Sequence, residues 1–243
     1  MQNVLVNQVT KDIQSGSSKN NSEIGFTIPG YRSYIAVTQE QKDKAYRLRH
    51  KVYSEELKWV PEAADGREID EFDAHSVLVC VENEAGILVG TIRVIDNEFE
   101  WLLEKYFPET SSKGVDLVKQ TSVVEVSRNA VLPEYRHKRL TDSGLTVLDI
   151  LFTMVMECGW HVMNKKNVVV TANPVMGAVL RRRGGAIRQI GPLINMDDGS
   201  KVTSYVMDTE VWRDTFKQRH MLFQEHFDYL NDCQKSELVV VSA

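Results

Sequence analysis

Strand and helix patterns alternate in the second half of the chain, and this alternation limits the possible folds more than any other feature. Four segments carry it in turn: a strand-like run at 122–131, a helical stripe at 145–156 that we expect to end at Gly159, a β-branched run at 167–172, and a helix that starts after Asn173-Pro174 and ends at Gly184 or Gly185. Asn favours the helix N-cap and Pro favours the first helical position. A further strand is expected at 201–208. Such alternation favours parallel strands covered by helices.

The first half of the chain has an antiparallel character. Thr38-x-x-Gln41 is a capping-box pattern, which predicts that a helix begins there. Two strands are expected at 75–82 and 87–95, joined by four residues in which Gly86 allows a positive φ. A hairpin followed by alternating strands and helices predicts one mixed-sheet α/β domain.

The two ends of the chain are expected to lie outside this α/β domain. Residues 1–25 are rich in Ser, Asn, Gln and Lys, and we expect a mobile N-terminal arm there. Residues 26–210 are expected to form the domain, and residues 211–243 a C-terminal helix and tail.

Composition and cysteine usage argue against several classes of function. The chain is 42% hydrophobic with a net charge of −5, a mild acidity that gives no reason to expect a nucleic-acid partner. The sequence shows neither a signal-peptide pattern nor an apolar run long enough for a membrane span, so we expect a cytoplasmic protein. Cys80, Cys158 and Cys233 are isolated, and the histidines show no metal-ligand spacing, so no metal is expected.

Charged residues occur inside two of the predicted strands. Arg93 lies in the second hairpin strand, and Glu125-x-Ser127-Arg128 lies in the strand at 122–131. Charges within a sheet are costly unless they are paired or take part in function. A structural ion-pair network is therefore one interpretation, and a polar active site is the other.

The order and spacing of a longer series favour the active site. The series consists of Arg49, Tyr53, Trp59, Asp70, Asp73, Arg93, Phe107 with Pro108, and Glu125-x-Ser127-Arg128. With this order and these gaps, the chain resembles the acyl-homoserine-lactone synthases, the LuxI-type autoinducer synthases, from about Tyr46 to Thr209. It departs from that family's usual pattern at Tyr53, Lys58 and Asn129, where Phe, Gly and an aromatic residue are usual.

The resemblance implies a GNAT-like acyltransferase fold of class α/β, in which helices flank a mixed central sheet. It also implies an enzyme that transfers an acyl group from an acyl carrier protein thioester to the amine of S-adenosylmethionine. Lactonisation would then yield N-acyl homoserine lactone, a quorum-sensing signal, and release methylthioadenosine. S-adenosylmethionine would be a substrate, and no separate cofactor is expected.

Glu125, Ser127 and Arg128 are the expected catalytic residues. The amine must lose a proton before it attacks the thioester, and we expect Glu125 to be the general base, acting through a water. Its position at the mouth of a splayed sheet would raise its pKa. On a regular strand Arg128 faces away from Glu125, so the two serve one site only if the strand bulges or Arg128 reaches around an edge.

The remaining charged residues of the series are expected to bind substrate. Asp70 and Asp73 would attract the positive charge of S-adenosylmethionine. Arg49 and Arg128 would hold its carboxylate, because a guanidinium offers a bidentate fork. Arg93 is expected to order the acidic segment.

Aromatic residues complete the expected substrate site. Trp59 and Tyr53 would stack on adenine or on a cation. Trp59 equally fits a loop aromatic that packs on the core. Phe107 belongs to the same set through its place in the series.

The acyl chain requires an apolar channel. The expected acyl-pocket residues are Leu148, Phe152, Thr171 and Met176. For most of these residues, the pattern favours the alternative of ordinary core between sheet and helices. Thr171 is the one polar member and would hydrogen-bond a substituent at the third acyl carbon.

The acyl donor is expected to be a carrier protein. The connection after residue 131 lacks the Gly-x-Gly turn that holds coenzyme A pyrophosphate in ordinary GNAT enzymes, although acyl-coenzyme A stays possible. The residues expected to receive the acidic carrier protein are Arg136, Lys138 and Arg139 together with Lys165 and Lys166. A solvated basic loop is the alternative for this cluster.

Two other functions stay open from the sequence. One is an N-acyl amino acid synthase on the same fold, which Tyr53 favours and which would need no place for adenine. The other is a non-catalytic binding protein on a degenerate GNAT fold.

Overall fold

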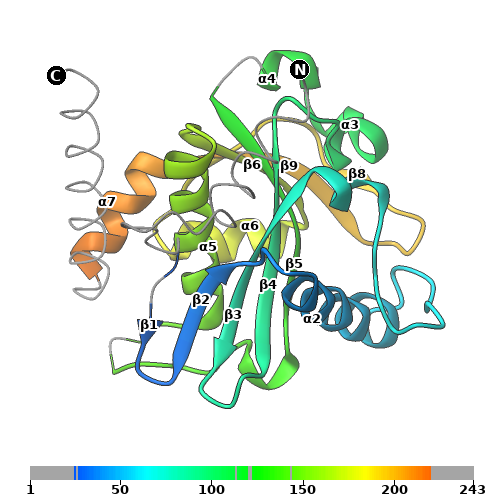
Figure 1. The fold of residues 1–243 in the computed structure, drawn as a ribbon. Helices are drawn as coiled ribbons and strands as arrows, with labels where there is room; N and C mark the ends of the chain where they lie inside the picture. The colour runs from blue at the N-terminus through cyan, green and yellow to red at the C-terminus, as the bar shows by residue number, and fades with distance from the viewer. Residues whose placement is uncertain (1–24, 26, 113, 120–121, 143, 220–243) are drawn as a thin grey trace, which may run out of the picture.

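The computed structural model describes residue 25 and residues 27–112, 114–119, 122–142 and 144–219. Residues 1–24 of the expected arm and residues 220–243 of the expected C-terminal helix and tail, among them Cys233, lie outside this part of the chain. The described residues form a twisted sheet with helices on both faces (Figure 1).

The strands follow the order β1-β2-β3-β4-β5-β6-β9-β7, and β8 pairs with β9. Their bounds are β1 Thr27–Ile28, β2 Tyr31–Ile35, β3 Ser76–Asn83, β4 Leu88–Asp96, β5 Val123–Val131, β6 Asn167–Ala172, β7 Ala186–Gln189, β8 Ile194–Asn195 and β9 Lys201–Asp208. Neighbouring strands are antiparallel, except that β5 and β6 are parallel. The sheet is therefore mixed, as expected from the sequence.

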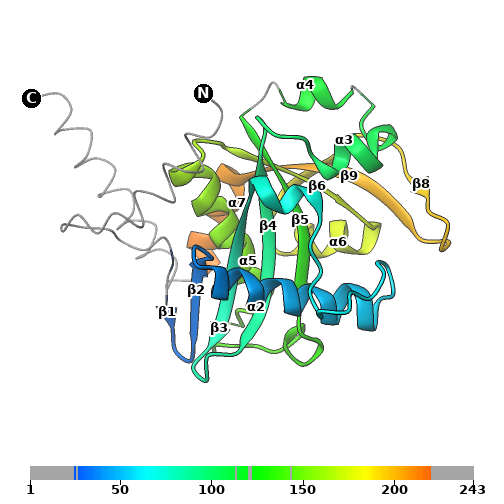
Figure 2. The same cartoon turned by 45° about the vertical axis from the view of Figure 1, so that its right-hand side comes forward.

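The helices divide between the two faces of the sheet. Their bounds are α2 Gln39–Arg49, α3 Leu102–Tyr106, α4 Val115–Lys119, α5 Val147–Glu157, α6 Pro174–Arg182 and α7 Thr209–Arg219. Shorter turns are the 3-10 helices Glu71–His75, Pro108–Thr110 and Pro133–Tyr135 and the π-helices His50–Glu56 and Cys158–Val162. Helix α2 crosses one face and α5 lies on the other (Figure 2).

Alternation along the strands builds a separate core on each face. We call the buried apolar cluster between the sheet and α5 the α5 core, and the one between the sheet and α2 the α2 core. On β3, Val79 and Val81 pack in the α5 core, whereas Leu78 and Cys80 pack in the α2 core. Helix α5 is apolar nearly all round, so it is buried along its whole length. The α5 core is accordingly the larger of the two.

Two irregularities in β5 shape the centre of the sheet. Strand β5 pairs with β6 from Val123 to Val126, and the two strands part beyond that point. On the other edge of β5, Thr91 faces Ala130 but Arg93 faces Ser127, so β5 carries an extra residue between them. Arg128 at this bulge has a φ of 50°, in the left-handed region. The sheet is thus splayed and bulged at one place.

Most expected elements are confirmed. Strands β6 and β9 have the expected bounds, Thr38 caps α2 in a capping box, and Gly86 has a φ of 74°. The expected end of the long helix at Gly159 is wrong, because a π-turn carries the helix on to Val162.

The sequence did not predict β1, β2, β7 or β8. Helix α7 packs Trp212 and Phe216 into the α5 core, so the expected domain boundary at residue 210 falls inside a packed helix. Among the described residues, no helix is long and apolar enough to cross a membrane.

Candidate active site

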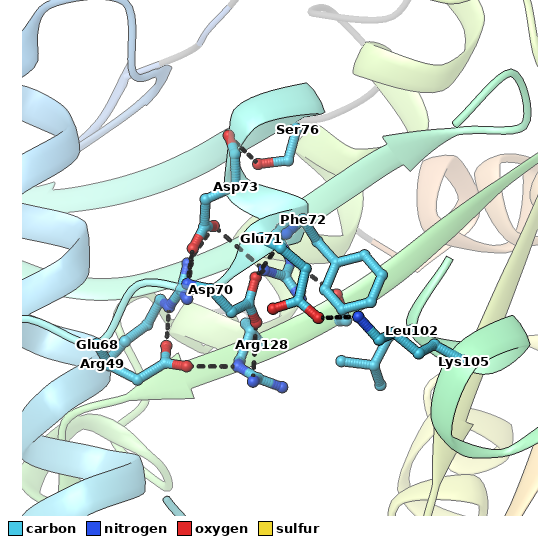
Figure 3. A network of polar contacts seen from close by, with 12 residues as sticks. Arg49, Glu68, Asp70, Glu71, Phe72, Asp73, Ser76, Leu102, Lys105 and Arg128 are labelled. Atoms are coloured by element: carbon cyan, nitrogen blue, oxygen red, sulfur yellow. Dashed lines mark hydrogen bonds and ion pairs between the residues drawn. The ribbon is translucent and has the colours of Figure 1, made fainter. Parts of the chain in front are cut away.

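Three arginines and three carboxylates form one ion-pair network on the α2 face of the sheet (Figure 3). The arginines come from α2, β4 and β5, and the carboxylates from the segment that follows α2: Arg49, Arg93, Arg128, Glu68, Asp70 and Asp73. The charges balance three to three, which is what burial of so many ionised groups requires.

Arg49 lies at the C-terminal end of α2 and is fully buried. Its Nη1 and Nη2 donate to the two carboxylate oxygens of Asp73, at 2.6 and 2.9 Å, and its Nε donates to Glu68. Burial alone would raise the pKa of Glu68 and of Asp73, but the adjacent guanidinium holds both pKa values below their ordinary range. Both carboxylates are therefore ionised near neutral pH.

Arg128 joins this network because of the bulge in β5. Its Nε donates to Glu68 at 3.0 Å, and its Nη2 lies 2.9 Å from Oδ2 of Asp70. Arg93 on β4 donates through Nε to Ser127 Oγ at 3.0 Å and through Nη1 to Asp70 and Asp73. The bulge in β5 that Arg128 needs to serve the same site as Glu125 is therefore present. The Arg128 side chain lies on the same face of the sheet as Arg93.

A local hydrogen-bond pattern explains why Asp70 and Asp73 lie three residues apart. Asp70 caps the 3-10 turn by accepting from the Phe72 backbone N–H at 3.0 Å, and Asp73 accepts from the Asp70 backbone N–H at 2.9 Å. This reciprocal capping box fixes both carboxylates relative to the backbone. The same two side chains can therefore hold the arginines in place.

Glu125 is almost fully buried, at 1% exposure, on the same face of the sheet. Its two carboxylate oxygens accept from the backbone N–H groups of Leu102 and Leu103, at 2.8 and 2.7 Å, where α3 begins. Burial raises the pKa of Glu125 to about 7, even though these two hydrogen bonds and Arg93 act in the opposite direction. A carboxyl with this pKa can take up a proton near neutral pH.

A cavity of about 410 Å³ opens where β5 and β6 part. It runs from the π-helix His50–Glu56 on the α2 face, past the bulge, to α5 and α6 on the other face. The predicted site residues that line it are Tyr53, Trp59, Ser127, Arg128, Arg136, Leu148, Phe152, Thr171 and Met176. The cavity thus joins residues expected for the substrate with those expected for the acyl chain.

Tyr53, Trp59 and Arg128 lie together at one end of this cavity. The Tyr53 and Trp59 ring centroids are 5.9 Å apart, and Cζ of Arg128 lies 5.6 Å from the Tyr53 ring centroid. The Tyr53 hydroxyl donates to the Asn129 carbonyl at 2.8 Å. Lys58 has a φ of 55°, a conformation that favours Gly, the residue usual at this position in the family named above. Trp59 is 57% exposed, so its face is open to a ligand rather than packed in the core.

The other predicted site residues do not line this cavity. They include the network residues Arg49, Asp70, Asp73 and Arg93, the carboxyl of Glu125, and Lys138 and Arg139. Phe107 packs in an apolar cluster with Phe72 and Trp101 and does not line the cavity. Lys165 and Lys166 lie beside Ser122, before β5 begins, whereas Arg136 contacts Val131 at its end. Nine residues of strand separate the two basic groups, roughly 26 Å.

The basic residues near the cavity have different surroundings. Arg136 is paired with Glu56 and donates to the Val131 carbonyl. Lys138 and Arg139 are exposed beside it. Two exposed cationic side chains, those of Lys138 and Arg139, therefore lie beside Arg136 in the cavity wall.

Two residues of the site received no role from the sequence. Glu68 belongs to the pattern Glu68-x-Asp70-x-x-Asp73, which includes two residues of the series described above, and in the structure it bridges Arg49 and Arg128. Arg183 lines the far end of the cavity and pairs with Asp149, but nothing in the run of arginines at 181–183 distinguishes it from its neighbours.

Comparisons with known proteins find similar acyltransferases. Residues 48–145 match the family model of the acetyltransferase (GNAT) domain. The acyl-homoserine-lactone synthase of Rhizobium radiobacter is 30% identical over 152 residues, covering 60% of this chain and 68% of that protein. The synthase of Aeromonas hydrophila is 29% identical over 173 residues, covering 65% and 82%.

Solved structures resemble the fold as well. The CoA-dependent acyl-homoserine lactone synthase BjaI, determined with MTA, superposes with a TM-score of 0.63 at 19% identity, covering 77% of this chain and 84% of that one. At this identity the likeness concerns the fold.

Proposed function

The chain belongs to the acyl-homoserine-lactone synthase family of acyltransferases, and from this premise we propose that it acylates the amine of S-adenosylmethionine with an acyl group carried on a thioester. Lactonisation of the product releases methylthioadenosine and yields N-acyl homoserine lactone. The observation that carries the proposal is the cavity through the splayed sheet, with aromatic and cationic residues at one end and apolar residues at the other.

The polar end of the cavity suits S-adenosylmethionine. Tyr53 and Trp59 offer aromatic faces to adenine or to the sulfonium. Arg128 lines the cavity beside them and suits the carboxylate, while Asp70 adds negative charge close by. Arg49 and Asp73 are engaged with each other, so their part is to hold this arrangement in place.

The acyl transfer needs a base and an oxyanion site. Glu125 takes the amine proton, and because Glu125 does not itself line the cavity, the proton passes through a water. The β5 bulge turns the backbone at Arg128 and Asn129 out of regular pairing, and we place there the N–H donors for the thioester oxyanion. Ser127, held by Arg93, lies between base and bulge.

The acyl donor is an acyl carrier protein. Lys138 and Arg139 are exposed next to Arg136, which lines the cavity, so an acidic carrier has cations to approach where its thioester would enter. Acyl-coenzyme A is the alternative donor, and a direct comparison of the two separates them.

The test incubates the purified full chain with S-adenosylmethionine and acyl groups of several lengths, each supplied on carrier protein and on coenzyme A. Methylthioadenosine and acyl homoserine lactone are measured by mass spectrometry. We expect both products, and we expect Glu125→Gln to lower kcat/KM at least a hundredfold. Glu82→Gln is the matched control, because Glu82 is also a buried sheet carboxylate but pairs with Arg32 and Lys44 away from the cavity.

Docking is tested by charge reversal. The double variant Lys138→Glu/Arg139→Glu should raise KM for the carrier-protein thioester about tenfold or more, with a smaller effect on the coenzyme A thioester. Lys166→Glu, at the other end of β5, is the control and should change neither. Failure to form methylthioadenosine with any donor would overturn the proposed reaction, and free amino acids would then be offered as acceptors.

A further inference from the structure

The start of helix α3 is the direct partner of the Glu125 carboxyl. The backbone N–H groups of Leu102 and Leu103 donate to its two oxygens at 2.8 and 2.7 Å. The neighbours of Glu125 in register, Ile95 on β4 and Val169 on β6, are apolar. Hydrogen bonds to an ionised carboxyl favour its ionised form. The position of these two N–H groups therefore bears directly on the proposed base.

Glu104 holds the start of α3 in place, and Lys119 holds Glu104. Oε2 of Glu104 accepts from the N–H of Trp101, the residue before the helix begins, at 2.6 Å. The same oxygen accepts from Nζ of Lys119 at 2.7 Å, and Nζ also donates to the Phe99 carbonyl at 2.7 Å. Lys119 is the last residue of α4, which lies with α3 at one end of the sheet (Figure 2). One lysine thus joins α4 to the segment that leads into α3.

This ion pair is shielded from solvent. The side chains of Glu104 and Lys119 are 24% and 17% exposed, and Lys119 Nζ lies 4.9 Å from the ring centroid of the fully buried Trp101. Charges in such a place act on their neighbours more strongly than surface charges do, because water screens them less. The charge of Glu104 opposes ionisation of Glu125, whereas Arg93 on β4 favours it. The cation of Lys119 offsets the charge of Glu104.

We propose that Glu104 and Lys119 are positioning residues for the base Glu125. Glu104 keeps the two N–H donors of α3 against the carboxyl, and Lys119 keeps the charge of Glu104 from opposing the loss of its proton. Neither residue lines the cavity, so both act through Glu125 and not on the substrate. The inference rests on the proposed function, in which ionised Glu125 accepts the amine proton.

Substitutions of the two members of this pair should act on Glu125 with opposite signs. Glu104→Gln keeps an oxygen that accepts from the Trp101 N–H but removes the negative charge, so the pKa of Glu125 should fall. Lys119→Met removes the cation and leaves the charge of Glu104, so the pKa of Glu125 should rise. A merely structural role of the pair would not move this pKa in opposite directions.

The test measures kcat/KM against pH with the purified full chain, S-adenosylmethionine and an acyl thioester. The midpoint of the unaltered profile should lie near pH 7, the pKa of Glu125. We expect Glu104→Gln to lower the midpoint by about half a pH unit and Lys119→Met to raise it by about the same amount. At pH 6 these shifts correspond to about a threefold gain and about a threefold loss of kcat/KM relative to the plateau.

Two further substitutions are the controls. Lys119→Arg preserves the cation and should keep the midpoint of the unaltered chain. Lys105→Met removes the same charge as Lys119→Met from the helix that carries Glu104, but Lys105 pairs with Glu71 at the surface. Its midpoint should stay within about 0.2 pH units of the unaltered one, because water screens this charge.

A titration without substrate reads the same carboxyl directly. Isotope-labelled glutamate carboxyl carbons are followed by NMR, and the Glu125 signal is identified by its absence from Glu125→Gln. The pKa of Glu125 should move in Glu104→Gln and Lys119→Met as the rate profile does. This measurement shows that the shifted midpoint belongs to Glu125, and thermal unfolding shows that each variant is folded.

The outcomes separate this inference from the proposed function. Midpoints that stay in place, or that move in the same direction in Glu104→Gln and Lys119→Met, overturn the inference in either measurement. A shift in Lys105→Met as large as that in Lys119→Met also overturns it. Lactone formation by the unaltered chain in the same assays leaves the proposed function standing. Absence of lactone from every donor overturns both.

Discussion

The buried carboxyl of Glu125 makes the stability of the protein depend on pH in a way that can be calculated. Its pKa is about 7 in the folded protein, against an ordinary value of 4.5, because burial disfavours the ionised form. Below pH 4.5 the carboxyl is protonated in both the folded and the unfolded chain. Between pH 4.5 and 7 the folded chain holds one more proton than the unfolded chain, so the free energy of unfolding falls as the pH rises, and above pH 7 this loss is complete.

The size of the effect follows from the difference between the two pKa values. That difference is worth about 3 kcal/mol, of which about three quarters is lost between pH 5 and pH 8. Glu125→Gln cannot titrate, so its free energy of unfolding lacks this contribution. The free energy of unfolding of the unaltered chain minus that of Glu125→Gln should therefore decrease by this amount between pH 5 and pH 8. Any cost of the substitution that does not depend on pH leaves this decrease unchanged.

Urea unfolding followed by tryptophan fluorescence at several pH values measures this difference. Glu56→Gln is a suitable control, because the hydrogen bond from Arg136 lowers the pKa of Glu56 instead of raising it. A pH-independent difference between the unaltered chain and Glu125→Gln would refute the argument from burial.

The same carboxyl should govern the pH profile of the reaction. If ionised Glu125 is the base, kcat/KM rises about tenfold per pH unit below pH 7 and levels off above it. A profile already flat at pH 5 would mean that the base is ionised there and that Glu125 does not act as proposed.

Three substitutions test other parts of the site. Arg49→Met leaves Glu68 and Asp73 buried without their main cation and should lower the free energy of unfolding by about 3–5 kcal/mol; a loss under about 1 kcal/mol in urea unfolding would contradict this. Trp59→Ala should raise KM for S-adenosylmethionine several-fold yet change stability by less than about 0.5 kcal/mol, since the side chain is mostly exposed; steady-state kinetics and thermal unfolding check both. Phe152→Ala should cost about 3–5 kcal/mol and shift the product profile in mass spectrometry towards longer acyl chains, and an unchanged profile would mean that Phe152 does not limit the cavity.

Local patterns predicted the elements whose periodicity is visible in the sequence. The β-branched run of β6 and the cap of α2 are examples. Strand β7 was missed because most of its residues are exposed and no alternation marks it. The long helix passes Gly159 because packing of its apolar residues outweighs the weak helix propensity of one Gly.

The amino-acid order, through the resemblance that it carries, named most residues of the proposed site, but it did not single out Arg183. It could not show that Arg128 shares a face with Arg93, since that depends on a bulge against a neighbouring strand. Nor could it show that the Glu125 carboxyl accepts from the backbone N–H groups of Leu102 and Leu103, 23 and 22 residues earlier in the chain. Burial and hydrogen-bond polarity are properties of partners brought together by folding, so they arise with the tertiary structure and are absent from any local pattern.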